Sequence, residues 1–265
     1  FDRVGRIMGT STWQRSPETE AWKRVRELYA QPDPSPAQVV SRIVAALEPQ
    51  TRAGMSDAAA TTCLATVVEG VQRVDRDGIE VTLTDLGVGT EPAAVQMAAG
   101  LRGRAQQTIA AEGYASRFGD LALEAVGTTT LALTTLSTSG AGIMEVPLAV
   151  AESNFGRCSR EDRLHELAAL FVGHELDRTF RYFVARDLPD FIGGEGVPSV
   201  SHANRLEDAV AAHCRDAWKD VTLSEYEDQL GRVIDHSPAE RVELLSPVMA
   251  AGVGRGLDLL AAGGN

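Results

Sequence analysis

Histidines that stand beside acidic residues are the side chains of this sequence best suited to chemistry. Two His-Glu pairs, His165-Glu166 and His174-Glu175, lie in a stretch with strong helical periodicity. Imidazole and carboxylate groups bind zinc, and zinc proteases present two histidines four residues apart on one helix. His165 and His174 are nine residues apart, which is about 900° of helical rotation, so they lie on opposite faces. We therefore expect no shared metal.

A second pattern places an acidic residue three positions from a histidine, so that both lie on one helix face. The pairs are Asp162/His165, His174/Asp177 and His213/Asp216. Di-iron bundles use Glu-x-x-His in that order. Only the Asp162/His165 pair has this order, with the shorter Asp. The simplest interpretation is pairing on helix surfaces, which contributes about 0.2–0.5 kcal/mol per pair.

Two further histidines have structural interpretations. His202 follows Ser199 and Ser201 at the end of a Gly-rich loop, where a helix cap is expected rather than a nucleophile and its base. His213 falls on an apolar stripe and is expected in a core or an interface. Its neighbour Cys214 would be an activated thiol only if a cation or a helix N-terminus lowered its pKa, and its place in mid-helix argues against that.

Charged residues near His174 have the spacing of a solvated helix face. Glu175/Arg178 and Asp177/Arg181 are three and four residues apart. Arginine and aromatic side chains are also enriched in protein interfaces. The interface candidates are therefore Arg178, Arg181, Tyr182 and Phe183.

Glycine-rich stretches do not match the loops that bind phosphates or nucleotides. Gly193, Gly194 and Gly196 connect two expected helices, whereas a dinucleotide-binding loop follows a strand. The nucleophile elbow Gly-x-Ser-x-Gly does not occur. We expect no cofactor.

Composition indicates an ordinary globular chain. Of its 265 residues, 44% are hydrophobic and 23% charged, and the net charge is −12. An acidic chain repels phosphate backbones, so nucleic-acid binding is not expected. The three cysteines form no disulfide or zinc pattern, which favours a cytoplasmic location. Only two of the 25 basic residues are lysine, which suggests a GC-rich bacterial genome.

Helical signals dominate the chain and predict a mostly α bundle of nine or ten helices. N-cap residues, or Pro in the first turn, mark the N-termini of many expected helices, and capping boxes appear at Thr222 and Ser237. The longest helix is expected from Ser159 to Leu188, about 44 Å. Further helices are expected at 202–220, 223–236 and 238–261. A helix is expected from Ser56 to about Val74, and the alternation at 79–83 is typical of a strand. Residues 72–83 could instead form a small β-hairpin, and we expect at most one such hairpin.

Glycine, Pro147 and Asn154 interrupt the helical period between residues 140 and 158. We expect an irregular connection there, between an N-terminal helical part (1–139) and a C-terminal helical part (159–265). One continuous domain is the alternative. The chain begins at Phe1 rather than Met, which leaves open whether its N-terminus is complete.

The segment 125–144 carries no charge over twenty residues and is rich in Thr and Ser. Its length suits a membrane span, but its apolar content is too low. A buried helix, with Thr hydroxyls bonded to carbonyls one turn back, is the leading interpretation. A self-association surface and a membrane-active segment are alternatives.

The leading functional hypothesis is a non-enzymatic helical protein that works through protein contacts, as a homo-oligomer or a subunit of a bacterial assembly. A metal- or His/acid-dependent enzyme is the second hypothesis. A membrane-active effector that uses 125–144 is the third.

Overall fold

A computed structural model describes residues 17–135 and 146–263 of this chain. The described residues are overwhelmingly helical, which confirms the prediction of a mostly α bundle. An isolated bridge between Ile192 and Val197 is the one β pairing among them. The helices are α1 (Glu20–Tyr29), α2 (Pro36–Ala46), α3 (Pro49–Gly54), α4 (Ala58–Asp77), α5 (Ile79–Asp85), α6 (Ala93–Glu112), α7 (Arg117–Thr135), α8 (Leu148–Arg160), α9 (Leu164–Asp187), α10 (Val200–Ala217), α11 (Glu227–Gly231) and α12 (Pro238–Ala262).

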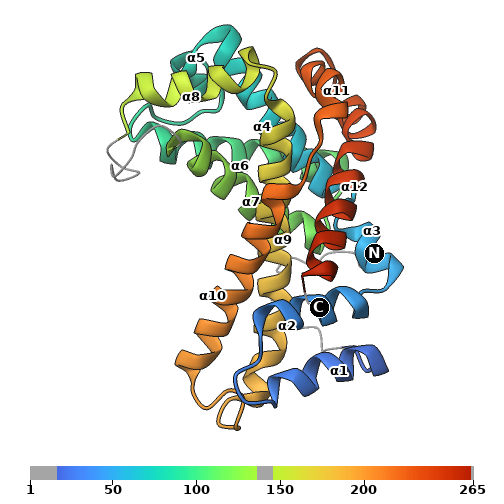
Figure 1. Ribbon diagram of the computed structural model, residues 1–265. Coiled ribbons are helices and arrows are strands. Elements are labelled where there is room, and N and C mark those ends of the chain that lie inside the picture. Colours follow the sequence, from blue (N-terminus) through green and yellow to red (C-terminus); the bar gives the residue numbers. More distant parts are fainter. Residues whose placement is uncertain (1–16, 136–145, 264–265) are drawn as a thin grey trace, which may run out of the picture.

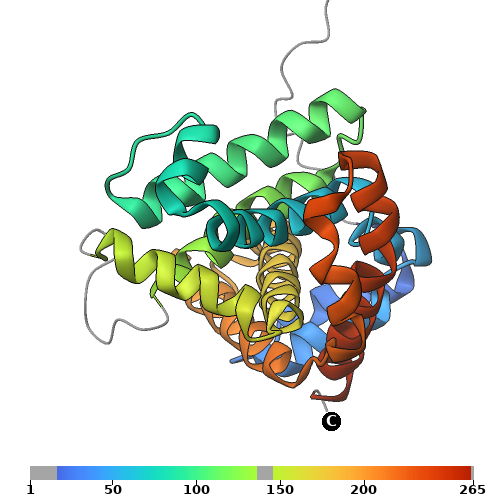
Figure 2. The same ribbon diagram turned by 90° about the horizontal axis from the view of Figure 1, so that it is seen from above.

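Helix α9 is the axis of the bundle. It packs against α7, α10 and α12 (Figure 1), and the view from above shows the other helices gathered around it (Figure 2). Gly252 and Gly256 let α12 approach closely, because a Cβ at either position would clash with Val172 or Leu176 of α9. Side chains from Trp22 to Leu260 form one connected core, so both halves of the chain contribute to it.

The β-hairpin predicted at 72–83 is wrong. Helix α4 continues to Asp77, and Ile79–Asp85 forms α5. Gly78 separates the two helices with φ +86°, a conformation that glycine adopts easily. Ile79 and Leu83 are buried, and the Thr82 hydroxyl donates to the Gly78 carbonyl at 2.8 Å. The alternation therefore reflects a short amphipathic helix.

The single helix predicted from Ser159 to Leu188 is divided. Helix α8 ends at Arg160 and α9 begins at Leu164, because Asp162 between them has φ +51°. Helix α9 has 24 residues, about 36 Å in length. Residues 148–158, expected as part of an irregular connection, belong to α8 instead. Phe155 on this helix is fully buried, and the burial of its apolar face overrides the glycine and asparagine in its sequence.

The described part of the uncharged segment, 125–135, is the second half of α7. Thr130 donates to the Val126 carbonyl at 2.7 Å and Thr134 to the Thr130 carbonyl at 3.0 Å. Thr129, Thr130 and Thr134 are fully buried. These residues form the packed helix with back-bonded hydroxyls that the sequence predicts. Residues 136–144 of the segment lie outside the described residues.

Helix α12 begins at the predicted capping box, in which Ser237 and Glu240 bond reciprocally. The box predicted at Thr222 does not start a helix: residues 223–236 form short turns and α11, and Glu225 pairs with Arg255. Among the described helices, Pro238–Ala262 alone is long and apolar enough to cross a membrane. That composition is weak evidence, since core helices share it, and α12 packs against α2, α4 and α9.

Candidate functional site

Helix α9 carries most of the predicted site residues, and it buries them. His174, Glu175 and Asp177 all lie inside the bundle. The solvated charged face predicted for Glu175/Arg178 and Asp177/Arg181 is therefore wrong. Other helices pack on nearly every side of α9. The face that the spacing of charged residues predicted to be solvent-exposed therefore contacts α7 and α10.

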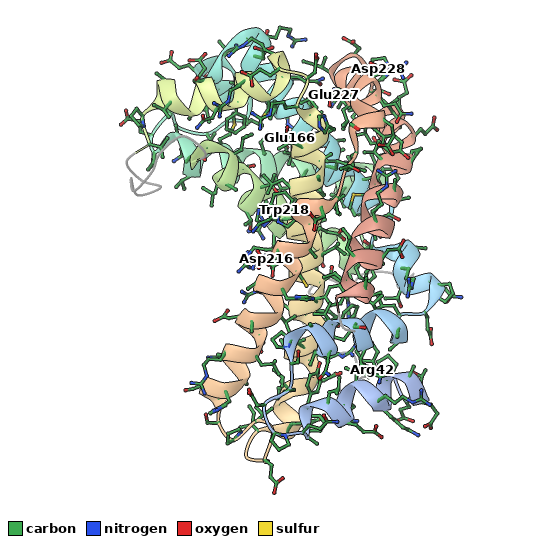
Figure 3. The ribbon with its side chains drawn as sticks, in the orientation of Figure 1. Arg42, Glu166, Asp216, Trp218, Glu227 and Asp228 are labelled. Atoms are coloured by element: carbon green, nitrogen blue, oxygen red, sulfur yellow. The ribbon has the colours of Figure 1, made fainter. Side chains whose placement is uncertain are left out.

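His165 lies at the start of α9 and faces Glu227 of α11, as Figure 3 indicates by the position of Glu227 beside the top of α9. Its Nδ1 is 2.7 Å from Glu227 Oε2. The same carboxylate accepts from the backbone N–H groups of Leu164 (3.0 Å) and His165 (2.8 Å). Glu227 thus caps α9 from 62 residues away. Asp162, the predicted partner, lies outside the helix, so the expected Asp162/His165 helix-face pair does not form.

His174 is buried, and neither ring nitrogen has a hydrogen-bond partner among the described residues. The preceding residue on α9, Gly173, packs against Trp218, which is labelled in Figure 3. Burial lowers the pKa of His174 to about 4, although the nearby Asp177 carboxylate opposes this shift. The imidazole is therefore neutral at physiological pH.

Asp177 bridges two helices through arginines. Its Oδ1 accepts from Arg181 Nε at 3.2 Å, and its Oδ2 accepts from Arg215 Nη1 of α10 at 3.3 Å. Both carboxylate oxygens are engaged by cations. This arrangement joins α9 to α10 and leaves Asp177 unsuited to act as a base for His174.

Glu175 is a buried acid whose surroundings the sequence did not reveal. Its side chain is fully buried, and neither carboxyl oxygen has a hydrogen-bond partner among the described residues. Burial raises the pKa of Glu175 well above its usual range, and the negative charge of Asp57 adds to the effect. Both effects favour the neutral form of this carboxyl. The sequence did contain one indication of this burial: Gly173 and Ala169 are small residues, and small residues favour close packing of helices.

The other predicted site residues lie away from His174, Glu175 and Asp177. Ser199 is the N-cap of α10 and accepts from the backbone N–H of His202, as predicted, and its hydroxyl lies 3.2 Å from His202 Nδ1. Both side chains are exposed. His213 is half-buried near Gly263 at the end of α12. Its predicted partner Asp216 pairs with Lys219 instead.

The four interface candidates have different environments. Arg178 faces α7, where it lies 3.7 Å from Glu124 and donates to Thr128. Arg181 lies 3.1 Å from Asp208 of α10. Phe183 is buried and therefore belongs to the core rather than to a free surface, whereas Tyr182 is half-buried.

Residues 17–135 and 146–263 contain no candidate metal site. No three His, Cys, Asp or Glu side chains in these ranges are placed to share an ion. Cys63, Cys158 and Cys214 are free and buried. Burial raises the pKa of all three thiols. They are not activated nucleophiles.

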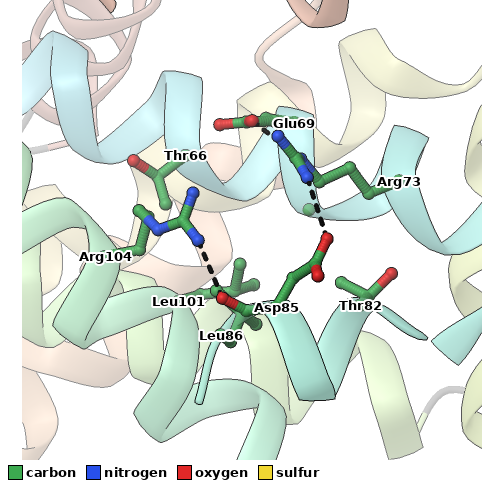
Figure 4. Close-up of a pocket in the computed structure, with 9 residues that line it drawn as sticks. Thr66, Glu69, Arg73, Thr82, Asp85, Leu86, Leu101 and Arg104 are labelled. Carbon is green, nitrogen blue, oxygen red and sulfur yellow. Dashed lines mark hydrogen bonds and ion pairs between the residues drawn. The ribbon is translucent and has the colours of Figure 1, made fainter. Parts of the chain in front are cut away.

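A small charged pocket between α4, α5 and α6 is shown in Figure 4. Glu69 pairs with Arg73 at 2.8 Å, Arg73 with Asp85 at 3.4 Å, and Arg104 donates to the Asp85 carbonyl. Arg241 of α12 also donates to Glu69. The cavity holds about 10 Å³, room for no more than one water. This cluster joins four helices and is structural.

A groove of about 570 Å³ lies between the loop after α1, the Gly-rich loop and α10. We call it the loop–α10 groove. Its apolar lining consists of Pro34, Pro36, Val197, Pro198, Leu206 and Ala209. Its charged lining consists of Asp33, Glu195, Asp208 and Arg205, beside His202. An apolar floor with a charged rim is typical of a protein-binding surface.

A second cavity, of about 290 Å³, lies where α1 and α3 face α7 and α9. We call it the Arg117 cavity. Its walls include Trp22, Phe118, Tyr182 and Phe183, together with Arg117 and Arg186. The Arg117 guanidinium lies 5.1 Å from the centre of the Tyr182 ring and donates to the Tyr182 hydroxyl. Two interface candidates from the sequence, Tyr182 and Phe183, therefore line a cavity.

Comparison with known proteins finds no match of this chain to a family model, a curated protein or a solved structure.

Proposed function

We propose that this chain is a non-enzymatic helical protein that binds another polypeptide through the loop–α10 groove, as a subunit of an assembly. The observation that carries the proposal is the groove itself, a concave apolar surface with a charged rim at one end of α10. Of the histidines and acids that an enzyme would use, His174 and Glu175 are buried away from the surface, and His165 and Asp177 are engaged by structural partners.

Apolar exposure supports this choice of surface. Four large hydrophobic side chains are exposed among the described residues, and two of them, Ile192 (40%) and Val200 (60%), flank the Gly-rich loop that forms one wall of the groove. Prolines at 34, 36 and 198 restrict the backbone of that wall and of the facing loop. A pre-organised surface loses less conformational entropy when a partner binds.

Charge indicates the kind of partner. Three carboxylates and one arginine line the groove, in a chain of net charge −12. Asp208 is already paired with Arg181, whereas Asp33 and Glu195 have no ion-pair partner among the described residues. A segment that presents one apolar side chain beside lysine or arginine complements this surface, since opposite potentials steer association.

The test is a selection of displayed peptides on the immobilised chain. We expect the selected peptides to combine basic and apolar residues. Their affinity should fall at least about tenfold when Asp33→Lys and Glu195→Lys are combined. A matched control, Asp228→Lys with Asp235→Lys, makes the same change of net charge at exposed acids elsewhere. Binders that lose affinity equally in both variants would contradict a docking role for the groove.

Self-association through another face remains a proposal. Light scattering of the purified chain measures it directly. The described residues of the uncharged segment belong to α7, and most of them are buried against neighbouring helices, which does not favour a self-association surface or a membrane-active segment in this conformation.

A further inference from the structure

We propose that the Arg117 cavity is a binding site for a small organic carboxylate with a planar apolar body. This inference is independent of the groove and of any polypeptide partner. It rests on the shape of the cavity, its aromatic walls and one arginine that has no acidic partner.

The size and lining suit a small ligand. The cavity of about 290 Å³ lies near the lower end of the volumes that hold small molecules, roughly 300–1,000 Å³. Trp22, Phe118, Tyr182 and Phe183 provide flat apolar walls. Trp22 and Phe183 are held in place by an edge-to-face contact with ring centres 5.6 Å apart. The walls are therefore pre-formed.

The two arginines of the cavity differ in how their charge is compensated. Arg186 lies over the rings of Trp22 (4.6 Å) and Phe183 (5.6 Å), and its Nε donates to Asp187 at 2.7 Å. Its charge is therefore neutralised. Arg117 donates to a neutral phenol and forms no ion pair with any described carboxylate. It is the uncompensated cation of the cavity.

The position of Arg117 adds to this imbalance. It is the first residue of α7, a helix of 19 residues, and Ser116 accepts from the Gly119 N–H as the cap. The N-terminus of a helix carries partial positive charge, so a cation is unfavourable there and an anion is favoured. Glu48 also lines the cavity, but it is exposed, and Asp120 in the first turn of α7 is exposed as well. Water screens both acids.

These features define the chemistry of the ligand. A carboxylate accepts two parallel hydrogen bonds from a guanidinium, which makes arginine its preferred partner. A planar body fits between aromatic walls by offset or edge-to-face stacking. Only a ligand that carries both features uses the charge and the walls together.

The test uses three probes with one ring system: 1-naphthoate, 1-naphthalenemethanol and 1-naphthylmethylamine. Titration calorimetry on the full chain should show saturable binding of the naphthoate. The alcohol and the amine should bind at least about tenfold more weakly, because they lack the charge that Arg117 recognises. The fluorescence of Trp22 should change on binding, and Trp22→Phe should abolish that signal.

Variants of the chain distinguish binding in the Arg117 cavity from nonspecific binding. Arg117→Gln should weaken naphthoate binding at least about tenfold, and Arg117→Lys should restore only part of it, because lysine lacks the planar fork. Arg42→Gln, an exposed arginine on α2 (Figure 3), is the matched control and should have no effect. Thr51→Phe, which fills the cavity, should block binding even if the Arg117 variants fold poorly.

Three results would overturn the proposal. They are no saturable binding of naphthoate at millimolar concentration, equal binding of the alcohol, and unchanged binding in both the Arg117→Gln and Thr51→Phe variants. The Asp33→Lys/Glu195→Lys variant should bind naphthoate normally. If the loop–α10 groove binds no peptide, naphthoate binding in the Arg117 cavity is still expected. If naphthoate does not bind, peptide binding in the groove is unaffected.

Discussion

The indole Nε1 of Trp22 donates a 2.6 Å hydrogen bond to Oδ2 of Asp187, which lies 165 residues later in the chain. Asp187 is fully buried and also accepts from Arg186, whose guanidinium lies over the Trp22 ring. A hydrogen bond, an ion pair and a cation–π contact thus meet at three residues. Together they hold α1 against the end of α9.

We expect Trp22→Phe to lower the free energy of unfolding by about 1.5–3 kcal/mol, because the bond to a buried carboxylate is lost while the aromatic packing is largely kept. Urea denaturation measures this change. Asp190→Asn is the control, since its pair with Arg26 is exposed and should contribute less than about 1 kcal/mol. Equal effects of the two substitutions would show that the Trp22–Asp187 bond contributes little.

His174 should make the protein less stable in mild acid. The pKa of His174 is lowered from 6.5 to about 4 by burial. Between these pH values His174 is therefore protonated in the unfolded chain and neutral in the folded chain. Stability from this group is therefore present above pH 6.5 and lost as the pH falls toward 4, by about 3 kcal/mol in total.

The His174→Leu variant removes this dependence. Denaturant unfolding of both proteins at pH 7.5 and pH 4.5 should show a smaller loss for the variant. Parallel losses would mean that water reaches the imidazole of His174 and that its pKa is ordinary.

Glu175 should have the opposite pH dependence. Burial raises its folded pKa, so its contribution is favourable below the unfolded pKa, near 4.5, and is lost as the pH rises. Glu175→Met removes a buried polar group without partners among the described residues, and should raise stability by about 1–3 kcal/mol at neutral pH. The gain should shrink toward pH 4.

The control for Glu175 is Glu166→Met, an exposed acid on the same helix (labelled in Figure 3). Glu166 pairs with Arg163 at 2.6 Å. Its effect should stay within about 1 kcal/mol and should not grow with pH in the same way. A destabilised Glu175→Met protein would indicate that the carboxyl is hydrogen-bonded to buried water in solution.

Glu227 should be required for the start of α9. Glu227→Gln keeps the size of the side chain but removes its charge and one acceptor, so the N–H groups of Leu164 and His165 lose a charged cap. We expect a loss of about 1–2 kcal/mol. Hydrogen exchange should show faster exchange at the first turn of α9 and little change at α7. Uniform changes across the molecule would argue against a local cap.

Where local interactions determine a helix, the sequence by itself predicted it. The capping box at Ser237 and the threonine-rich helix through Val126 and Thr130 depend on residues within one turn of each other, so their signals are complete in the sequence. The same reasoning placed His165 and His174 on opposite faces of one helix.

Tertiary structure alone decided which of those faces meet water. The spacing of Asp177 and Arg181 is the same on a solvated helix and on α9, where α10 covers Asp177 and adds Arg215. The cap that Glu227 places on α9 and the bond from Trp22 to Asp187 join residues far apart in the chain. Such contacts form because apolar faces are buried against one another, and the sequence shows the faces without showing which of them will meet.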